Sequence, residues 1–234
     1  MHSFVWKEST VYQSDFATLD DGCWLNDAVV FCALQHAALL AQHQNRKAEV
    51  VSPGAMFILR HENDTDDIDD IVEPLLEADT VLFPVNNAAV SNDSGTHWSL
   101  LVATRGQGTN WTTFHVDSHG NYNAEAAAQL SQQLRESTSR LVQNVGSGSH
   151  STVQQCAQQD NSSDCGLFCI AQARHYLQHG DVIRTDGLPV DTRVLRTEVR
   201  QMLQRLTQLA RGTGDNRDLS AIPFERIQAV LASD

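Results

Sequence analysis

The spacing of hydrophobic and polar residues predicts helices toward both ends of the chain and strands between them. Apolar side chains recur at helical spacing in the segments 24–44, 124–142, 165–179 and 191–209. Two shorter helices are predicted, one starting at the Ser52-Pro53 cap and one after Pro223. Strand-like segments are 80–85, 97–104, 111–116 and 151–157. Helices around a central run of strands indicate an α+β fold.

The second and third predicted strands flank a short polar segment that is typical of a tight turn. If this turn is centred on Gln107, His97 faces Asp117 across the hairpin, with Cβ atoms roughly 5 Å apart. An imidazole oriented by a carboxylate is the base that a catalytic cysteine requires. A bulge or a longer loop would shift this register, and a histidine at a strand start can also be an ordinary surface residue. In the same register His115 would face Ser99.

Cys165 stands at the first turn of a predicted helix. Unpaired backbone N–H groups and the positive end of the helix dipole lower the pKa of a thiol in that position. Gly166 would let a substrate backbone approach the sulfur. The alternative is a small buried residue at a helix start. Cys169 lies one turn further on and is expected in the core, and no comparable context surrounds the other cysteines, Cys23, Cys32 and Cys156.

The number of cysteines and the net charge indicate the cellular compartment and exclude some classes of partner. Five cysteines in 234 residues argue against a disulfide framework and for a reducing, intracellular compartment, the cytoplasm or the nucleus. A net charge of −13 argues against a nucleic-acid partner. The longest apolar run, 28–34, is too short to span a bilayer, and the N-terminus lacks the pattern of a secretory signal. We expect one domain over residues 1–234.

A metal site and a cofactor site are not expected. Cys156, Cys165, Cys169 and His175 lack the paired spacing of zinc ligands, and the chain has no phosphate-cradling glycine motif. Residues 62–73 hold seven acidic side chains, and we interpret this run as a solvated surface loop.

Four motifs carry a resemblance to a known family. They are Trp24-Leu25-Asn26-Asp27, the segment 96–102 (Thr-His-Trp-Ser-Leu-Leu-Val), the segment 114–118 (Phe-His-Val-Asp-Ser) and the segment 158–166 (Gln-Gln-Asp-Asn-Ser-Ser-Asp-Cys-Gly). In this order they resemble the ubiquitin-like protease family of cysteine proteases, which remove SUMO or related modifiers. Within the family the strongest resemblance is to the Nedd-specific proteases, the deneddylases, and it extends over residues 11–231. It implies a papain-like fold in which helices pack on a central mixed or antiparallel sheet.

The resemblance also implies roles in catalysis. Cys165 would be the nucleophile, His97 the general base and Asp117 the acid that orients it. Gln159, six residues before the cysteine, would donate its side-chain amide to the oxyanion hole. A preorganised donor of this kind contributes about 3–4 kcal/mol to catalysis.

Four further residues match positions that bind the modifier in the family. Trp24 and Trp98 resemble the aromatic pair that forms a tunnel over a C-terminal Gly-Gly, although core packing would explain either residue. Asn86 and Asp27 resemble polar residues near the modifier's tail. Asp27 and part of the acidic run could therefore meet a basic face of the modifier.

One departure and several alternatives accompany this interpretation. Ser163 stands where the family usually has an aromatic residue, which weakens one wall beside the nucleophile. The implied activity is a thiol isopeptidase or peptidase that cleaves after the Gly-Gly of a Nedd-type modifier. The first alternative is a SUMO or ubiquitin protease, such as an effector acting in a host cell. The others are an acyltransferase of a related clan and a modifier-binding module without activity.

Overall fold

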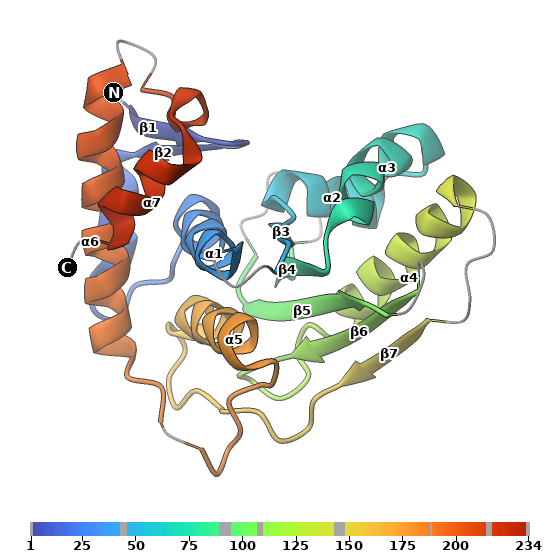
Figure 1. Cartoon of the computed structure of the whole chain (residues 1–234). Helices are drawn as coiled ribbons and strands as arrows, with labels where there is room; N and C mark the ends of the chain where they lie inside the picture. The colour runs from blue at the N-terminus through green and yellow to red at the C-terminus, as the bar shows by residue number, and fades with distance from the viewer. Residues whose placement is uncertain are drawn as a thin grey trace.

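A five-stranded mixed sheet forms the centre of the computed structural model, which describes residues 2–42, 46–88, 95–106, 110–142, 148–187, 189–213 and 217–232 (Figure 1). The sheet has the order β3-β4-β5-β6-β7. Its three central strands are antiparallel, and each outer strand runs parallel to its neighbour. The bounds are β3 Ala48–Val50, β4 Thr80–Asn86, β5 Trp98–Arg105, β6 Trp111–Val116 and β7 Ser149–Thr152.

Helices cover both faces of this sheet (Figure 1). The helices are α1 Asp27–Gln42, α2 Pro53–His61, α3 Thr65–Val72, α4 Ala124–Leu141, α5 Cys165–His179, α6 Thr192–Ala210 and α7 Phe224–Ala232. The short 3₁₀ helices are η1 Gln13–Leu19, η2 Glu73–Glu77, η3 Arg211–Thr213 and η4 Leu219–Ala221, and β1 His2–Trp6 pairs with β2 Ser9–Tyr12.

Side-chain alternation along β5 divides the interior into two cores, because successive residues of a strand point to opposite faces. Leu100 and Val102 pack with α1, α5 and α6 on one face. Leu101 and Ala103 pack with α2, α3 and α4 on the other. Within the described part of the chain, no helix is long and apolar enough to cross a membrane.

The helices follow the predicted pattern closely, whereas the strands do so only in part. Helix α5 spans the predicted segment and ends at Gly180, whose φ of 80° is the left-handed conformation that favours glycine. Strands β1, β2 and β3 were not predicted. The strand predicted over residues 151–157 is wrong beyond Thr152, where the chain leaves the sheet and turns.

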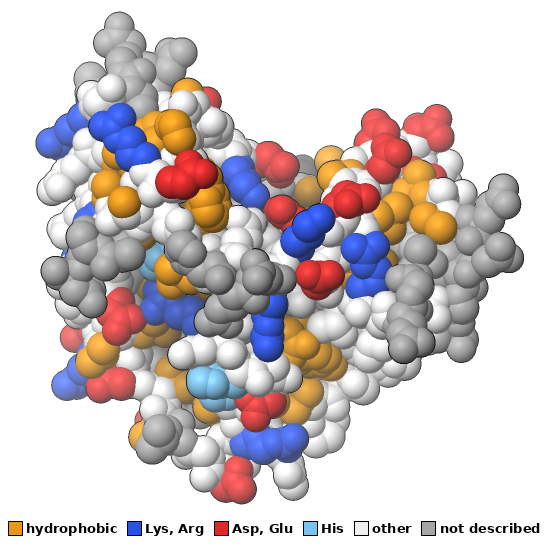
Figure 2. Space-filling model, in the orientation of Figure 1, with side chains coloured by type: hydrophobic (Ala, Val, Ile, Leu, Met, Phe, Trp, Pro, Cys, Tyr) orange, Lys and Arg blue, Asp and Glu red, His pale blue; other side chains and the backbone are white. Residues whose placement is uncertain are grey.

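The loop predicted for the acidic run is wrong, because helix α3 occupies residues 65–72 of the run 62–73. Ile68 and Val72 are buried on its inner face, and the side chain of Asp64 caps its first turn by accepting the Asp66 backbone N–H at 2.9 Å. Asp69 accepts hydrogen bonds from Arg140 at 2.6 Å and Ser137 at 2.6 Å on α4. Acidic side chains gather over this part of the surface (Figure 2). Apolar side chains at helical spacing therefore outweigh the acidic composition of the segment.

The β5–β6 hairpin has a different register from the predicted one. Leu101 pairs with His115, so the pairing is shifted by two positions. Ser99 is not the backbone partner of His115, although its hydroxyl lies 2.8 Å from Nε2 of His115. Gln107, the predicted turn centre, lies outside the described residues. The backbone N–H of Gly106 donates to the Asn110 carbonyl at 2.9 Å, so the connection is longer than a turn centred on Gln107 allows. His97 and Asp117 consequently lie just beyond the strand ends and not directly opposite each other.

Candidate active site

A cleft of about 190 Å³ opens where the segment before β5 meets the first residues of α1 and α5. Six of the eight residues singled out from the sequence line it: Trp24, Asp27, Asn86, His97, Trp98 and Cys165. The other four lining residues are Leu25, Asn26, Gly95 and Thr96. Two predicted site residues, Asp117 and Gln159, are not among the lining residues.

His97 and Asp117 are joined although their strands are not in the predicted register. The Nε2 atom of His97 lies 2.6 Å from Oδ1 of Asp117, and both residues are buried. Asp117 also accepts the backbone N–H groups of His119 at 2.9 Å and Asn123 at 3.0 Å. Burial raises the pKa of Asp117, but these hydrogen bonds lower it further than burial raises it. Asp117 is therefore ionised and fixes the orientation of the His97 ring.

The same ring reaches Cys165. Burial lowers the pKa of His97, but hydrogen bonds to Asp117 and to Cys165 outweigh it and raise this pKa to about 9. His97 therefore carries a proton at neutral pH. Because Nε2 faces Asp117, Nδ1 is the nitrogen that remains for the sulfur. A protonated imidazole beside a cysteine favours the thiolate, which is the nucleophilic form.

Cys165 is the first residue of α5 and is buried. Gly166 was expected to leave room for a substrate backbone, but Leu25 already fills the space beside it. A Cβ atom at position 166 would lie 3.0 Å from Cβ of Leu25, so glycine allows α5 to pack against the segment before α1. The carbonyl of Leu25 also accepts the Nε1–H of Trp98 at 3.0 Å. Leu25 thus connects the cysteine's helix to one aromatic wall of the cleft.

Gln159 is half-buried, and neighbouring groups hold its amide. Its Oε1 accepts the hydroxyl of Ser118 at 2.7 Å, and its Nε2 donates to the Asn161 carbonyl at 2.6 Å. An amide nitrogen carries two hydrogens, so one remains for another acceptor. The predicted part of Gln159 in an oxyanion hole stays a prediction.

The two tryptophans of the cleft differ in their surroundings. Trp24 is 47% exposed, whereas Trp98 is 4% exposed and belongs to the main hydrophobic core. Asp27 is exposed at the cleft, yet partial burial of its carboxyl raises its pKa. The Asn86 side chain accepts the Ala88 backbone N–H at 2.8 Å. Trp98 therefore serves both as a core residue and as a wall of the cleft.

Sequence reasoning missed the aromatic neighbours of His97. The Tyr122 ring meets His97 edge-on, with centroids 5.3 Å apart, and the His119 ring lies 5.8 Å away. Tyr122 is 59% exposed. Ser163, where the family usually has an aromatic residue, is buried. An aromatic residue therefore does lie beside the His97 imidazole, and it comes from the loop after Asp117.

Asn123 is a second residue that sequence reasoning missed. Its side chain does not cap the helix. The Nδ2 atom lies 3.0 Å from the Val85 carbonyl, 3.2 Å from the His97 carbonyl and 3.1 Å from the Ser99 hydroxyl. Its backbone N–H donates to Asp117. Asn123 thus links the ends of β4, β5 and β6 around the His97–Asp117 pair.

Replacing Asn123 by alanine should lower both stability and turnover. Loss of the amide leaves buried carbonyls without a donor, which costs about 1–3 kcal/mol in the free energy of unfolding. The alkaline limb of the pH–rate profile should also move to lower pH, because the amide no longer fixes the His97 carbonyl and the imidazole is held less firmly against Asp117. Asn121→Ala, an exposed change in the same loop, is the control. An unchanged pH profile in Asn123→Ala would reduce its role to stability.

A buried ion pair holds the start of α5 and was also missed. Asp164 Oδ1 lies 2.6 Å from Nη2 of Arg196 on α6. The same guanidinium donates to the carbonyls of Thr18 at 3.2 Å, Asp20 at 3.1 Å and Cys23 at 2.9 Å. Arg196 therefore joins the residue before the nucleophile to the loop that leads into Trp24.

Comparisons with known proteins show which proteins this chain resembles in sequence and in fold. A model of the Ulp1 protease family, C-terminal catalytic domain, matches residues 24–205. Sentrin-specific protease 8 of Homo sapiens is 27% identical over 186 residues, which cover 78% of this chain and 84% of the human protein. NEDD8-specific protease 1 of Arabidopsis thaliana is 30% identical over 174 residues, covering 72% of each protein.

Solved structures share the fold. A de-sumoylating protease matches with a TM-score of 0.66 and 16% identity, over 98% of this chain and 97% of that one. The Ulp1 protease domain in complex with Smt3, the yeast orthologue of SUMO, matches with a TM-score of 0.64 and 16% identity, over 87% and 86% of the two chains. The fold expected from the sequence motifs is thus confirmed, and the chain belongs to the Ulp1 protease family of cysteine proteases.

Proposed function

We propose that this enzyme cleaves the peptide or isopeptide bond that follows the C-terminal Gly-Gly of a ubiquitin-like modifier, with a Nedd-type modifier preferred. The observation that carries the proposal is the His97 ring, which joins Asp117 to Cys165 beside a cleft bordered by Trp24 and Trp98. The substrate segment that carries the scissile carbonyl must be thin enough to enter that cleft, and glycine has no side chain to exclude.

The reaction follows from the proton that His97 carries. The thiolate of Cys165 attacks the carbonyl carbon of the second glycine, and the carbonyl electrons move onto oxygen. The backbone N–H of Cys165 and the Gln159 amide stabilise this oxyanion. As the C–N bond breaks, the His97 imidazolium gives its proton to the leaving amine. Neutral His97 then takes a proton from water, which attacks the thioester, releases the modifier's carboxylate and restores the thiolate.

The preference for a Nedd-type modifier rests on the curated relatives and on Asp27. One relative is named as specific for NEDD8, and Asp27 places an exposed carboxyl at the cleft, where it can bind a cationic residue of the modifier's tail. A SUMO protease is the second candidate, because one structural neighbour is a SUMO complex. The acidic helix α3 contributes no residue to the cleft lining, so Asp27 is the acidic contact that we retain. All five cysteines are free, and we propose that the enzyme acts in a reducing compartment.

Modifiers that carry a C-terminal electrophile test the proposal directly. Nedd-type, SUMO and ubiquitin probes are mixed with the enzyme, and covalent adducts are followed by mass spectrometry. We expect the Nedd-type probe to react fastest, through Cys165, and Asp27→Asn to reduce its advantage. Faster reaction of the SUMO probe would favour the second candidate, and a lack of adduct with all three probes would contradict modifier cleavage.

Trp24 separates the role of the cleft from that of the core. Because Trp24 is half-exposed, Trp24→Ala should change the free energy of unfolding by no more than about 0.5 kcal/mol. A poorly positioned tail should nevertheless lower kcat/KM by on the order of 100-fold. Tyr12→Ala removes an equally exposed aromatic ring outside the cleft and is the control. Trp98→Ala, in contrast, should cost about 3–5 kcal/mol of stability because that ring is buried.

A further inference from the structure

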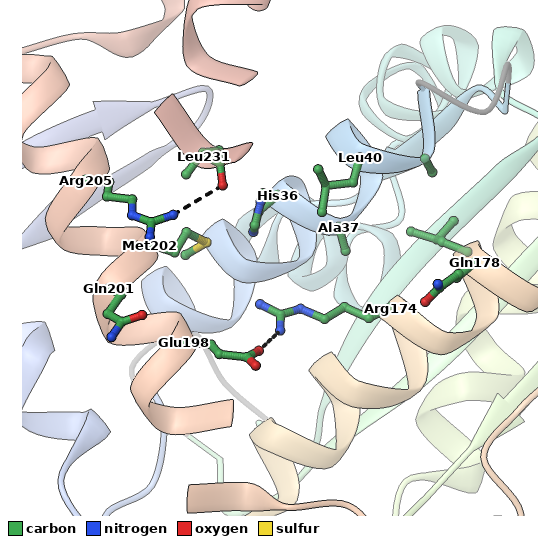
Figure 3. A pocket seen from close by; sticks show the side chains of 12 residues that line it. His36, Ala37, Leu40, Arg174, Gln178, Glu198, Gln201, Met202, Arg205 and Leu231 are labelled. Carbon is green, nitrogen blue, oxygen red and sulfur yellow. Dashed lines mark hydrogen bonds and ion pairs between the residues drawn. The ribbon is translucent and has the colours of Figure 1, made fainter. Parts of the chain in front are cut away.

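A second cavity, of about 440 Å³, lies between α1, α5, α6 and the end of α7 (Figure 3). Its volume is in the range of small-molecule pockets, about 300–1,000 Å³. It shares no lining residue with the catalytic cleft. His36 on α1 follows Asp27 by nine residues, and Arg174 on α5 follows Cys165 by nine. At about 1.5 Å of rise per residue, the cavity lies roughly 13 Å along both helices from the cleft.

His36 lines this cavity, and its ring makes no hydrogen bond within the described part of the chain. Among the described residues, neither of its ring nitrogens has a hydrogen-bond partner, although both atoms are buried. Burial and the charges of Arg174 and Arg205 lower its pKa to about 4, so the ring is neutral at physiological pH. A buried neutral imidazole with an unused donor and an unused acceptor is uncommon in a folded protein.

Two arginines on different helices face the same space (Figure 3). Arg174 Nη1 pairs with Glu198 Oε2 at 2.8 Å, but its buried Nε has no partner among the described residues. Arg205 Nη1 donates to the Leu231 carbonyl at 3.4 Å, which is long for a hydrogen bond. The lining thus holds two positive charges and one negative charge, in a chain whose net charge is −13.

The remaining walls are largely apolar. They include Ala37, Leu40, Leu177, Met202 and Leu231. Small-ligand sites typically combine such walls with a few convergent polar groups. Guanidinium groups match carboxylate oxygens in charge and geometry, and the single excess positive charge matches one carboxylate. A doubly charged phosphate would instead meet the unfavourable charge of Glu198.

We propose that this cavity binds a small organic carboxylate with an apolar body. The carboxylate accepts hydrogen bonds from the guanidinium of Arg205, whose bond to the Leu231 carbonyl is long. The apolar body packs on Leu40, Met202 and Leu231.

Calorimetric titration with hexanoate, acetate and hexanol tests the site. Hexanoate should bind at least about tenfold more tightly than acetate, which lacks the apolar body, and than hexanol, which lacks the charge. Arg205→Gln should weaken hexanoate binding about tenfold. Arg193→Gln removes the same charge from an exposed position on α6 that does not line the cavity, and it should leave the affinity unchanged.

Several results would overturn the proposal. If hexanol bound as tightly as hexanoate, the cavity would bind apolar chains without regard to charge. If acetate bound as tightly as hexanoate, the apolar walls would contribute nothing to binding. Tighter binding of hexyl phosphate would contradict the assignment of the carboxylate. An equal loss in Arg193→Gln would show unspecific attraction to positive charge. Cys165→Ala should bind hexanoate as the native enzyme does, so this test is independent of the catalytic proposal.

Discussion

Cys165→Ala is expected to abolish cleavage of a modifier precursor while leaving modifier binding intact. The variant has no sulfur to form the thioester, and loss of a catalytic nucleophile lowers turnover by about 10⁴-fold or more. Binding should survive because the other cleft residues, from Trp24 to Trp98, do not depend on the thiol. Turnover is measured with a fluorogenic modifier substrate, and affinity by calorimetry.

Cys23→Ala is the matched control, since Cys23 is a free, exposed cysteine. It should retain full turnover. If Cys165→Ala cleaved its substrate at the native rate, another group would have to be the nucleophile. If it lost modifier binding as well as turnover, the variant would have to be checked for an altered α5.

His97→Ala and Asp117→Asn should have the next largest effects. Removal of the base should lower turnover nearly as far as removal of the nucleophile, and misorientation of the imidazole by Asp117→Asn should lower it about 10³- to 10⁴-fold. The native pH–rate profile should fall on its alkaline side near pH 9, because His97 loses its proton there and can no longer protonate the leaving amine.

The sign of the shift in Asp117→Asn follows from the contacts of His97. Burial lowers the pKa of His97, whereas the hydrogen bond that His97 donates to the Asp117 carboxylate raises it. Without the carboxylate the alkaline limb should therefore move to lower pH. His119→Ala leaves the His97–Asp117 bond in place and should keep that limb near pH 9. If the alkaline limb stayed near pH 9 in Asp117→Asn, the group that titrates there would not be His97.

The sequence predicted most helices because each carries its own signal. A cap and an apolar face define α2, and Gly180 ends α5 where a left-handed residue is needed. The edge strand β3 has three residues and too little pattern to be recognised. Helix α3 was mistaken for a loop because charge was weighed above the spacing of Ile68 and Val72.

Residues of the cleft were found because they lie within short contiguous motifs, such as Trp24 to Asp27. The partners that hold them were not found, because they are distant in sequence and ordinary in type. Asn123 lies 38 residues from the Val85 carbonyl that accepts its amide. The register of the β5–β6 hairpin could not be predicted either, because it depends on the length of the connection between the strands, which composition does not reveal. His97 and Asp117 nevertheless meet, because residues beyond strand ends are not confined to the ladder.

Arg196 is made later in synthesis than the residues that it holds in place around the cleft. His97, Asp117 and Cys165 have all been made once residue 165 is added, but the cation that holds Asp164 comes 32 residues after Asp164. A nascent chain that ends before Arg196 leaves the carbonyls of Thr18, Asp20 and Cys23 without this donor. The loop that carries Trp24 is then not tied to the nucleophile's helix. We therefore expect a chain that ends before α6 to carry His97, Asp117 and Cys165 without the contacts that join the Trp24 loop to the start of α5.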